Sequence, residues 1–281
     1  MNTPQELPVY ELYAIRYAQR DAMRSSHFMG GDAHDGPMPM DYFVWVAVAE
    51  GNAVLIDLGF TQEAARKRKR EFLCDPIESL RLLDIDPKAV KDVVITHMHY
   101  DHAGNFHLLP NARFHLQESE MHFAVGRNMR HRYFASGYEA EDVVQAIRLN
   151  FAGRMVQYDG EAEIAPGIRV VPAPGHSPGE QVVCVHTQRG WVVVASDASH
   201  YYENLQKRRP YPAAHNVENM IESFERVLKL ACGDIARVIP GHDPMVMQIY
   251  PPARPGLEGR IARLDVQPAP MPERPPLKPL A

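Results

Sequence analysis

Four side chains that could bind metal ions lie within six positions of the segment DVVITHMHYDHAGN. An apolar run typical of a strand ends at Thr96, and directly after it come His97, His99, Asp101 and His102. Residues two apart in an extended chain share a face, so His97 and His99 can point at one metal ion. The turn that follows carries Asp101 and His102 towards a second ion. The segment therefore predicts a site for two metal ions.

Three further strand-like runs end on residues of the same kinds. The run in IRVVPAPGHSPG leads to His176 and the run in ARVIPGHD leads to His242, and glycine allows each turn to tighten at the strand end. Between them, WVVVASDAS ends on Asp197. A single histidine of this kind is more often a hydrogen-bonded loop residue than a ligand. Three such positions in order after the histidine-rich segment favour one shared metal site.

The types of these ligands indicate the chemistry. Nitrogen and carboxylate ligands without a thiolate set suit zinc, and also manganese, iron or cobalt. Two cations that share a water lower its pKa towards neutrality and yield hydroxide at pH 7. One cation can then polarise a carbonyl, and the Asp101 carboxylate can orient the proton of the hydroxide. We therefore expect a hydrolase with two divalent ions, zinc first among the candidates.

Strands and helices must bring these residues together from both halves of the chain. Runs rich in Val, Ile and aromatic residues predict strands over residues 9–15, 41–50, 53–59, 92–96, 113–116, 168–171, 181–187, 191–196 and 236–240. Helical periodicity predicts helices over residues 62–73, 76–83, 118–125, 140–150 and 216–231. No linker divides the two halves, so we expect a single α/β domain with sheets covered by helices.

The end of the chain has a different composition. Residues 251–281 are proline-rich and lack a sustained period. We expect a tail that wraps the surface or is partly extended, outside a hydrolase domain formed by residues 1–250.

One predicted helix carries a basic cluster, namely Arg66, Lys67, Arg68, Lys69 and Arg70. Nothing glycine-rich or aromatic accompanies these residues. We therefore interpret the cluster as a solvated helix face in preference to a phosphate site.

The composition limits the classes of partner that the protein is expected to bind. The net charge of -5 provides no basic field for a nucleic-acid backbone, which favours a small-molecule substrate. The N-terminal stretch has no basic region followed by an apolar one, and no apolar run approaches a membrane span, so we expect a cytoplasmic protein without a membrane partner. Cys74, Cys184 and Cys232 show no CxxC spacing and are interpreted as structural thiols. The sequence leaves open whether the protein forms a homodimer.

In order and spacing, these motifs resemble the metallo-β-lactamase superfamily over about residues 8–250. The resemblance implies a four-layered αβ/βα sandwich with the site at one edge of its two sheets. It implies that the first metal binds His97, His99 and His176. It implies that the second binds Asp101, His102 and His242, with Asp197 bridging both. Asp57, which closes AVLIDLG, resembles the family's aspartate that orients the histidine loop; the alternative is an ordinary turn aspartate before Gly59.

Within the superfamily, the chain is most similar to the N-acyl homoserine lactonases. The similarity rests on HMHYDHAGN, PGHSPGEQ, SDAS and the stretch FMGGDAHDGPMPMDYFVWVAV. It implies hydrolysis of an N-acyl homoserine lactone or a related small lactone by a hydroxide that bridges the metals. A thioesterase, ester hydrolase or phosphodiesterase on the same metals is the alternative. A non-catalytic metal-binding sensor is disfavoured because no ligand is missing.

Substrate contacts come from less specific signals. Methionines and aromatic residues can form an adaptable acyl or aryl pocket, and core packing is the alternative for each; the candidates are Phe28, Met29, Met38, Met40, Tyr42, Met121, Phe123, Tyr133 and Phe134. In the lactonases, a tyrosine three residues after the bridging aspartate contacts the substrate carbonyl. Here that position is His200, followed by Tyr201 and Tyr202. We expect one of these three to donate to the substrate oxygen.

Overall fold

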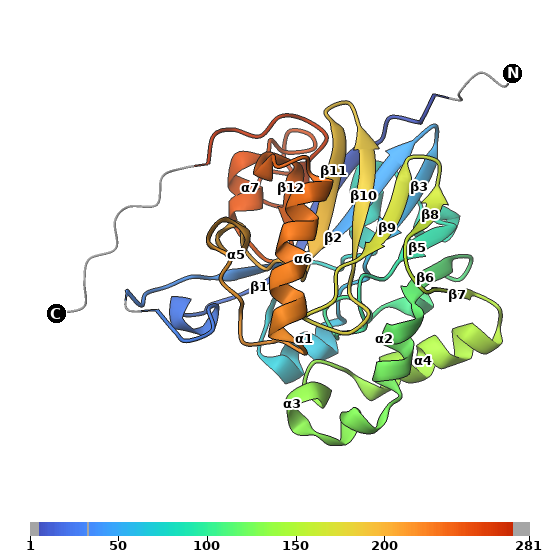
Figure 1. Ribbon diagram of the computed structural model, residues 1–281. Coiled ribbons are helices and arrows are strands. Elements are labelled where there is room, and N and C mark those ends of the chain that lie inside the picture. The colour runs from blue at the N-terminus through green and yellow to red at the C-terminus, as the bar shows by residue number, and fades with distance from the viewer. Residues whose placement is uncertain (1–5, 33, 272–281) are drawn as a thin grey trace, which may run out of the picture.

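The computed structural model describes residues 6–32 and 34–271 (Figure 1). Its larger sheet runs in the order β13-β1-β2-β3-β5-β6-β7, and β4 pairs with β1. The bounds of these strands are β1 Glu11–Arg20, β2 Met40–Ala49, β3 Asn52–Ile56, β4 Glu71–Phe72, β5 Asp92–Val94, β6 Arg113–Gln117, β7 Met155–Tyr158 and β13 Ile261–Arg263.

The second sheet runs in the order β12-β11-β10-β9-β8. Its strands are β8 Ala162–Ala165, β9 Ile168–Pro172, β10 Gln181–Thr187, β11 Gly190–Ser196 and β12 Val238–Pro240. Here β11 and β12 are parallel while the other neighbours are antiparallel. In the larger sheet, β3, β5, β6 and β7 are parallel.

The two sheets pack face to face because both faces of their central strands are apolar. In β2, Phe43 and Trp45 enter the core between the sheets, whereas Val44 and Val46 point to the outer face of the larger sheet. In β10, the Val183 side chain likewise points into the core between the sheets, and the side chains on either side of it point to the outer face of the smaller sheet.

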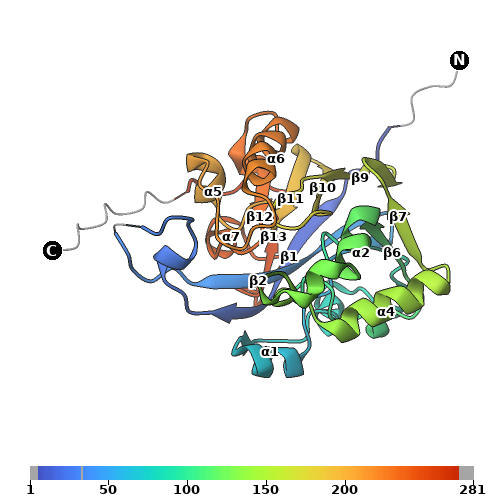
Figure 2. The same ribbon diagram turned by 60° about the horizontal axis from the view of Figure 1, so that its bottom comes forward.

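Helices cover both outer faces, as Figure 2 shows. Helices α2 (Glu118–Ala124) and α4 (Ala140–Phe151) pack on the larger sheet, and α6 (Val217–Leu230) packs on the smaller one. The other helices are α1 Gln62–Arg68, α3 Arg132–Ala135, α5 Tyr202–Lys207 and α7 Met245–Ile249. The expected four-layered αβ/βα sandwich is therefore confirmed. No helix in the described ranges is long and apolar enough to cross a membrane.

Every predicted strand is present, and most predicted helices are present with shifted ends. Helix α6 begins where the Asn216 side chain accepts from the Asn219 amide at 3.0 Å, a typical N-cap. The stretch expected as a helix over 76–83 is a 3-10 helix from Glu78 to Leu83. Strands β4, β7, β8 and β13 were not predicted, because they are short and lack a long apolar run.

The interpretation of residues 251–281 as a separate tail is wrong for their first part. Strand β13 pairs with β1, with Ile15 opposite Ile261. Leu264 is fully buried between the sheets, and its amide donates to the Leu12 carbonyl at 2.7 Å. The proline-rich composition gave no sign that these few apolar residues attach the segment to the larger sheet and the core. The expected tail beyond residue 271 lies outside the described residues.

Candidate metal centre and its pocket

The candidate ligands gather because four strands end at the same edge of the two sheets. The histidine-rich segment follows β5, His176 follows β9, Asp197 follows β11 and His242 follows β12. Parallel neighbours such as β11 and β12 deliver their carboxyl ends side by side. The chain thereby brings all seven side chains predicted from sequence into one place.

Two groups of ligand atoms meet there, and the atoms within each group lie within 4.8 Å of one another. One group is His97, His99 and His176, and the other is Asp101, His102, Asp197 and His242. A third set of His176, Asp197 and His200 overlaps both.

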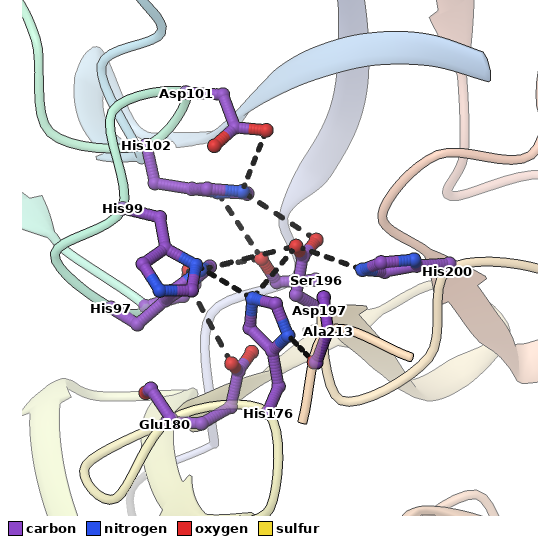
Figure 3. A network of polar contacts seen from close by, with 12 residues as sticks. His97, His99, Asp101, His102, His176, Glu180, Ser196, Asp197, His200 and Ala213 are labelled. Atoms are coloured by element: carbon purple, nitrogen blue, oxygen red, sulfur yellow. Dashed lines mark hydrogen bonds and ion pairs between the residues drawn. The ribbon is translucent and has the colours of Figure 1, made fainter. Parts of the chain in front are cut away.

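Asp197 stands between the two groups, as Figure 3 shows. Its Oδ2 lies 3.3 Å from His176 Nε2 and 3.9 Å from His97 Nε2. Its Oδ1 lies 3.0 Å from His242 Nε2, and 3.5 Å from Nε2 of His102. Oδ2 also lies 3.3 Å from His242 Nε2. The Asp197 carboxylate therefore contacts ligand atoms of both groups, which is the arrangement of a shared carboxylate ligand.

Orphaned polar atoms test whether metal ions fit this set. Within the described residues, His97 Nε2, His102 Nε2 and Asp197 Oδ1 are buried and have no hydrogen-bond partner. A buried polar atom without a partner is costly, and a cation would satisfy all three. The residues present therefore fit divalent metal ions.

The charge states of His97, His99 and Asp197 suit metal binding. Burial lowers the pKa of His97 and His99 well below the usual value, which keeps these imidazoles neutral as ligation requires. Burial acts to raise the pKa of Asp197, but His242, His200 and His102 outweigh it and hold that pKa well below its usual range. Asp197 therefore stays ionised.

His102 and His242 differ from these groups in their charge state. Burial acts to lower the pKa of His102 and His242, but Asp197 and Asp101 outweigh it and raise both pKa values. These two histidines therefore lose a proton when they bind a metal ion.

A second set of contacts orients the histidines. Asp57, at the end of β3, accepts from His102 Nδ1 at 2.7 Å and from the Thr96 amide at 2.7 Å. His242 Nδ1 donates to the Asp41 carbonyl at 2.8 Å. With Nδ1 engaged in this way, Nε2 of each histidine faces the centre. Asp57 thus lies where the family resemblance places it.

Two buried glutamates beside the histidines were not predicted. Glu120 of α2 accepts from the Met98 amide at 3.0 Å, Ser177 Oγ at 2.7 Å and Tyr138 OH at 2.8 Å. It thereby ties the histidine-rich segment to the loop of His176. Its sequence context, ESEMHFA, resembles an ordinary amphipathic helix and carries no signal for this role.

Glu180 is the second of these glutamates. It is fully buried, and Oε2 lies 3.6 Å from His97 Nδ1. Both carboxylate oxygens lack a hydrogen-bond partner within the described residues. Its signal in the sequence is an acidic residue directly before the apolar run QVVCVHT.

A cavity of about 490 Å³ opens over the centre, with Asp101 and Asp197 in its lining. Five of the predicted pocket residues line it, namely Met40, Tyr42, Phe123, Tyr133 and Phe134. The other four do not. Phe28 and Met38 pack with Tyr201 and with Met40, the Met121 side chain of α2 lies in the core, and Met29 is 41% exposed.

Of the three candidate donors, His200 alone lines the cavity. Its Nε2 lies 3.1 Å from Asp197 Oδ2, and its ring stacks on Tyr211. Burial lowers the pKa of His200 to about 3, although Asp197 acts in the opposite direction. The imidazole is therefore neutral.

The expectation for Tyr201 and Tyr202 does not match their positions. Tyr201 is the N-cap residue of α5, and its hydroxyl contacts His27 Nε2 at 3.0 Å. Tyr202 is buried in the core between the sheets. The chain turns into a helix directly after His200, so both phenols leave the cavity.

The interpretation of the basic cluster as a solvated helix face also needs correction. Arg66, Lys67 and Lys69 are exposed, but Arg68 and Arg70 are half-buried and line the cavity, as does Arg20. Helix α1 ends at Arg68, so the periodicity of a longer helix does not apply to Arg70.

Known proteins are similar to this chain in sequence. An N-acyl homoserine lactonase of Bacillus cereus is 27% identical over 165 residues, which are 58% of this chain and 60% of that protein. N-acyl homoserine lactonase AttM of Azorhizobium caulinodans is 26% identical over 233 residues, which are 76% of this chain and 85% of the relative.

A crystal structure of a quorum-quenching N-acyl homoserine lactone lactonase has the same fold. It superposes with a TM-score of 0.71 at 22% identity, covering 85% of this chain and 94% of that one. The family model described as the metallo-beta-lactamase superfamily matches residues 39–242, a segment that holds all seven candidate ligands. The resemblance found in the sequence is thereby confirmed, and the chain belongs to the metallo-beta-lactamase superfamily.

Proposed function

We propose that this protein is a dinuclear metal-dependent hydrolase that opens the ring of a small lactone. The position of Asp197 carries the proposal, because its carboxylate lies between two groups of ligand atoms and contacts members of both. The names of the relatives, N-acyl homoserine lactonases, support a lactone as the substrate class. Zinc is the metal we expect first, given a nitrogen and carboxylate ligand set.

The metal ions, when bound, supply a hydroxide nucleophile at neutral pH and polarise the substrate carbonyl. The chain supplies the rest. His97, His99 and His176 would hold one ion, while Asp101, His102 and His242 would hold the other, with Asp197 shared between the two. The Asp101 carboxylate, with Oδ2 at 3.7 Å from both His102 Nε2 and His242 Nε2, is placed to orient the proton of the nucleophile.

The cavity wall binds and orients the substrate. The single N–H of the neutral His200 imidazole faces Asp197 Oδ2 at 3.1 Å. With that carboxylate engaged by metal ions, the same N–H would be free to donate to the carbonyl oxygen as negative charge develops there. Phe123 and Phe134 stand edge to face at 5.5 Å and offer an apolar surface to the acyl side of the substrate.

A substrate panel tests this proposal. The metal-replete protein is assayed by proton release with lactones, a thioester and a phosphodiester, and we expect turnover of lactones. Asp197→Asn should lower turnover by several orders of magnitude, because it weakens control of the nucleophile and of both metals. His186→Ala is the control, since His186 lies in β10 and contacts the Pro8 carbonyl.

Several outcomes would change the proposal. Turnover of the thioester or phosphodiester alone would reassign the bond that is broken. Metal binding without turnover of any of the three would favour a metal-binding sensor. A metal content of one per chain with full activity would exclude the dinuclear site. A cytoplasmic location and a homodimer stay predictions.

A further inference from the structure

Three arginines line the cavity over the metal centre although the chain as a whole is acidic. Arg20 ends β1, Arg68 ends α1, and Arg70 lies between α1 and β4. All three are half-buried. A half-buried cation needs a compensating partner, so the partners of each guanidinium decide what it can do.

Arg68 has its partners within the protein. Its guanidinium pairs with Glu139 at 2.7 Å and donates to the Ser136 carbonyl at 2.8 Å. It also stacks over the Tyr100 ring at 3.7 Å. Its charge is therefore already compensated.

Arg20 and Arg70 are compensated less well. The Arg20 guanidinium donates to the sulfur of Met40, at 2.8 Å from Nη2 and 3.1 Å from Nε, and a thioether is a weak acceptor. Arg70 donates to Tyr100 OH at 3.2 Å and to the Arg68 carbonyl at 2.8 Å. It also lies over the Tyr42 ring at 6.0 Å and interacts with Asp101 at longer range. Neither arginine forms an ion pair with a carboxylate in the part of the chain that the structure describes.

The carboxylates in the cavity would not be available to these arginines once metal ions are bound. Among the described residues, only Asp101 and Asp197 bring a carboxylate to its lining, and both belong to the candidate metal groups. Bound cations would neutralise them and leave the cavity strongly positive. Two planar guanidinium forks in such a place match a carboxylate or phosphate group.

We infer that the cavity selects substrates that carry an anionic group, a carboxylate or a phosphate, which Arg20 and Arg70 bind. The inference rests on the proposed function and specifies its substrate class. The volume of about 490 Å³ and the aromatic surface of Phe123 and Phe134 indicate a compact apolar body joined to that anion. A long neutral acyl chain would offer neither guanidinium a charged partner.

Three γ-butyrolactones test the inference. They carry the same phenyl ring and differ in its para substituent, which is a carboxamide, a carboxylate or a phosphate. We expect kcat/KM to be about tenfold or more higher for an anionic lactone than for the carboxamide, the size of one charge-assisted hydrogen bond. The two anionic lactones distinguish a carboxylate site from a phosphate site.

Variants assign the effect to the arginines. Arg20→Gln and Arg70→Gln should each reduce the preference for the anionic lactone, chiefly through a higher KM. Arg66→Gln is the matched control, because Arg66 is exposed outside the cavity, and it should keep the full preference. Equal kcat/KM for the anionic and neutral lactones in the unmodified protein would overturn the inference, as would a preference that survives in both variants.

A binding measurement separates this inference from the proposed function. If no lactone is hydrolysed, calorimetric titration of the metal-replete protein with benzoate, phenylphosphonate and benzamide still reports on the anion site. Binding of an anion that weakens about tenfold in Arg20→Gln or Arg70→Gln, but not in Arg66→Gln, supports the arginine site while the lactonase proposal fails. Equal binding by all the proteins overturns it.

Discussion

At the scale of single residues, close contacts fix the rings of the candidate ligands. His99 packs directly against the backbone of Gly137, because a Cβ built at that position would lie 2.5 Å from His99 Cδ2 and Nε2. The backbone also restrains Asp197, since a Cβ at Gly241 would lie 2.5 Å from its Oδ1. The missing side chains of these two glycines make room for His99 and Asp197, and the close backbone limits where each side chain can move.

Gly137→Ala should therefore displace the His99 imidazole. We expect a lower metal content after equilibrium dialysis and a loss of stability of about 1–3 kcal/mol, as is typical of overpacking. Elemental analysis and thermal unfolding measure the two effects. Gly36→Ala is the control, because nothing lies within 4 Å of a Cβ at Gly36. Equal metal content in both variants would show that the His99 ring can shift without cost.

His200→Ala tests the donor at the cavity wall. Removal of a hydrogen bond to the developing oxyanion should lower kcat by roughly 10²–10³ with the metal content unchanged. Tyr201→Phe should keep its rate, since the phenol contacts His27 away from the cavity. Loss of metal in His200→Ala would instead make His200 a ligand, together with His176 and Asp197.

The sequence was sufficient for residues whose position follows from local structure. His97, His176 and His242 each follow the end of a strand, so pattern alone places them at one edge. Glu120, Glu180 and Arg20 acquire their roles from segments far apart in the chain, such as the contact of Glu120 with Ser177. No local pattern reports such an approach, which is why these residues were not predicted.

At the scale of secondary structure, long elements could be predicted from local pattern, whereas short ones depend on distant parts of the chain. Strand β2 is a long apolar run and helix α6 has a strong helical period, and both were predicted. Strands β7 and β8 are each four residues long and depend on their neighbours in the sheet. The two tyrosines after His200 were expected in a loop at the cavity. They lie elsewhere because Tyr201 is the N-cap of the short helix α5, which begins at Tyr202.

The first turn of α4 contains a buried acid that makes stability depend on pH. Burial raises the pKa of Asp142 to about 7, with Glu139 adding to the effect, against an ordinary value of 3.8. The folded protein therefore holds this proton between about pH 4 and 7 while the unfolded chain does not, so stability falls as pH rises through that window.

Asp142→Asn should remove this dependence. We expect its melting temperature to exceed that of the unmodified protein at pH 8, with a gain that shrinks as the pH is lowered towards 5. Thermal unfolding at several pH values measures it. Asp159→Asn changes an exposed carboxylate and should show no comparable trend. A gain that is the same at every pH would assign the effect to packing and exclude titration.

At the scale of the whole molecule, the chain closes its larger sheet with its own C-terminal part. Leu264 is fully buried in the core between the sheets. Leu264→Ala should lower the free energy of unfolding by about 2–5 kcal/mol, as is typical of a buried leucine. Urea unfolding measures it. Leu7→Ala, at a side chain that is 40% exposed, should change it by no more than about 0.5 kcal/mol. Equal effects would mean that the segment after residue 250 does not stabilise the domain.

Pairing of β1 with β13 also joins two strands that leave the ribosome far apart in time. About 240 residues separate Arg20 from Ile261. At roughly 5–20 residues per second, synthesis of that stretch takes on the order of 10–50 s. During this time the backbone of Tyr13–Ile15 lacks its β13 partner and presents an open strand edge, which can pair with other chains. The growing chain, before β13 is made, is therefore the form of this protein most exposed to aggregation.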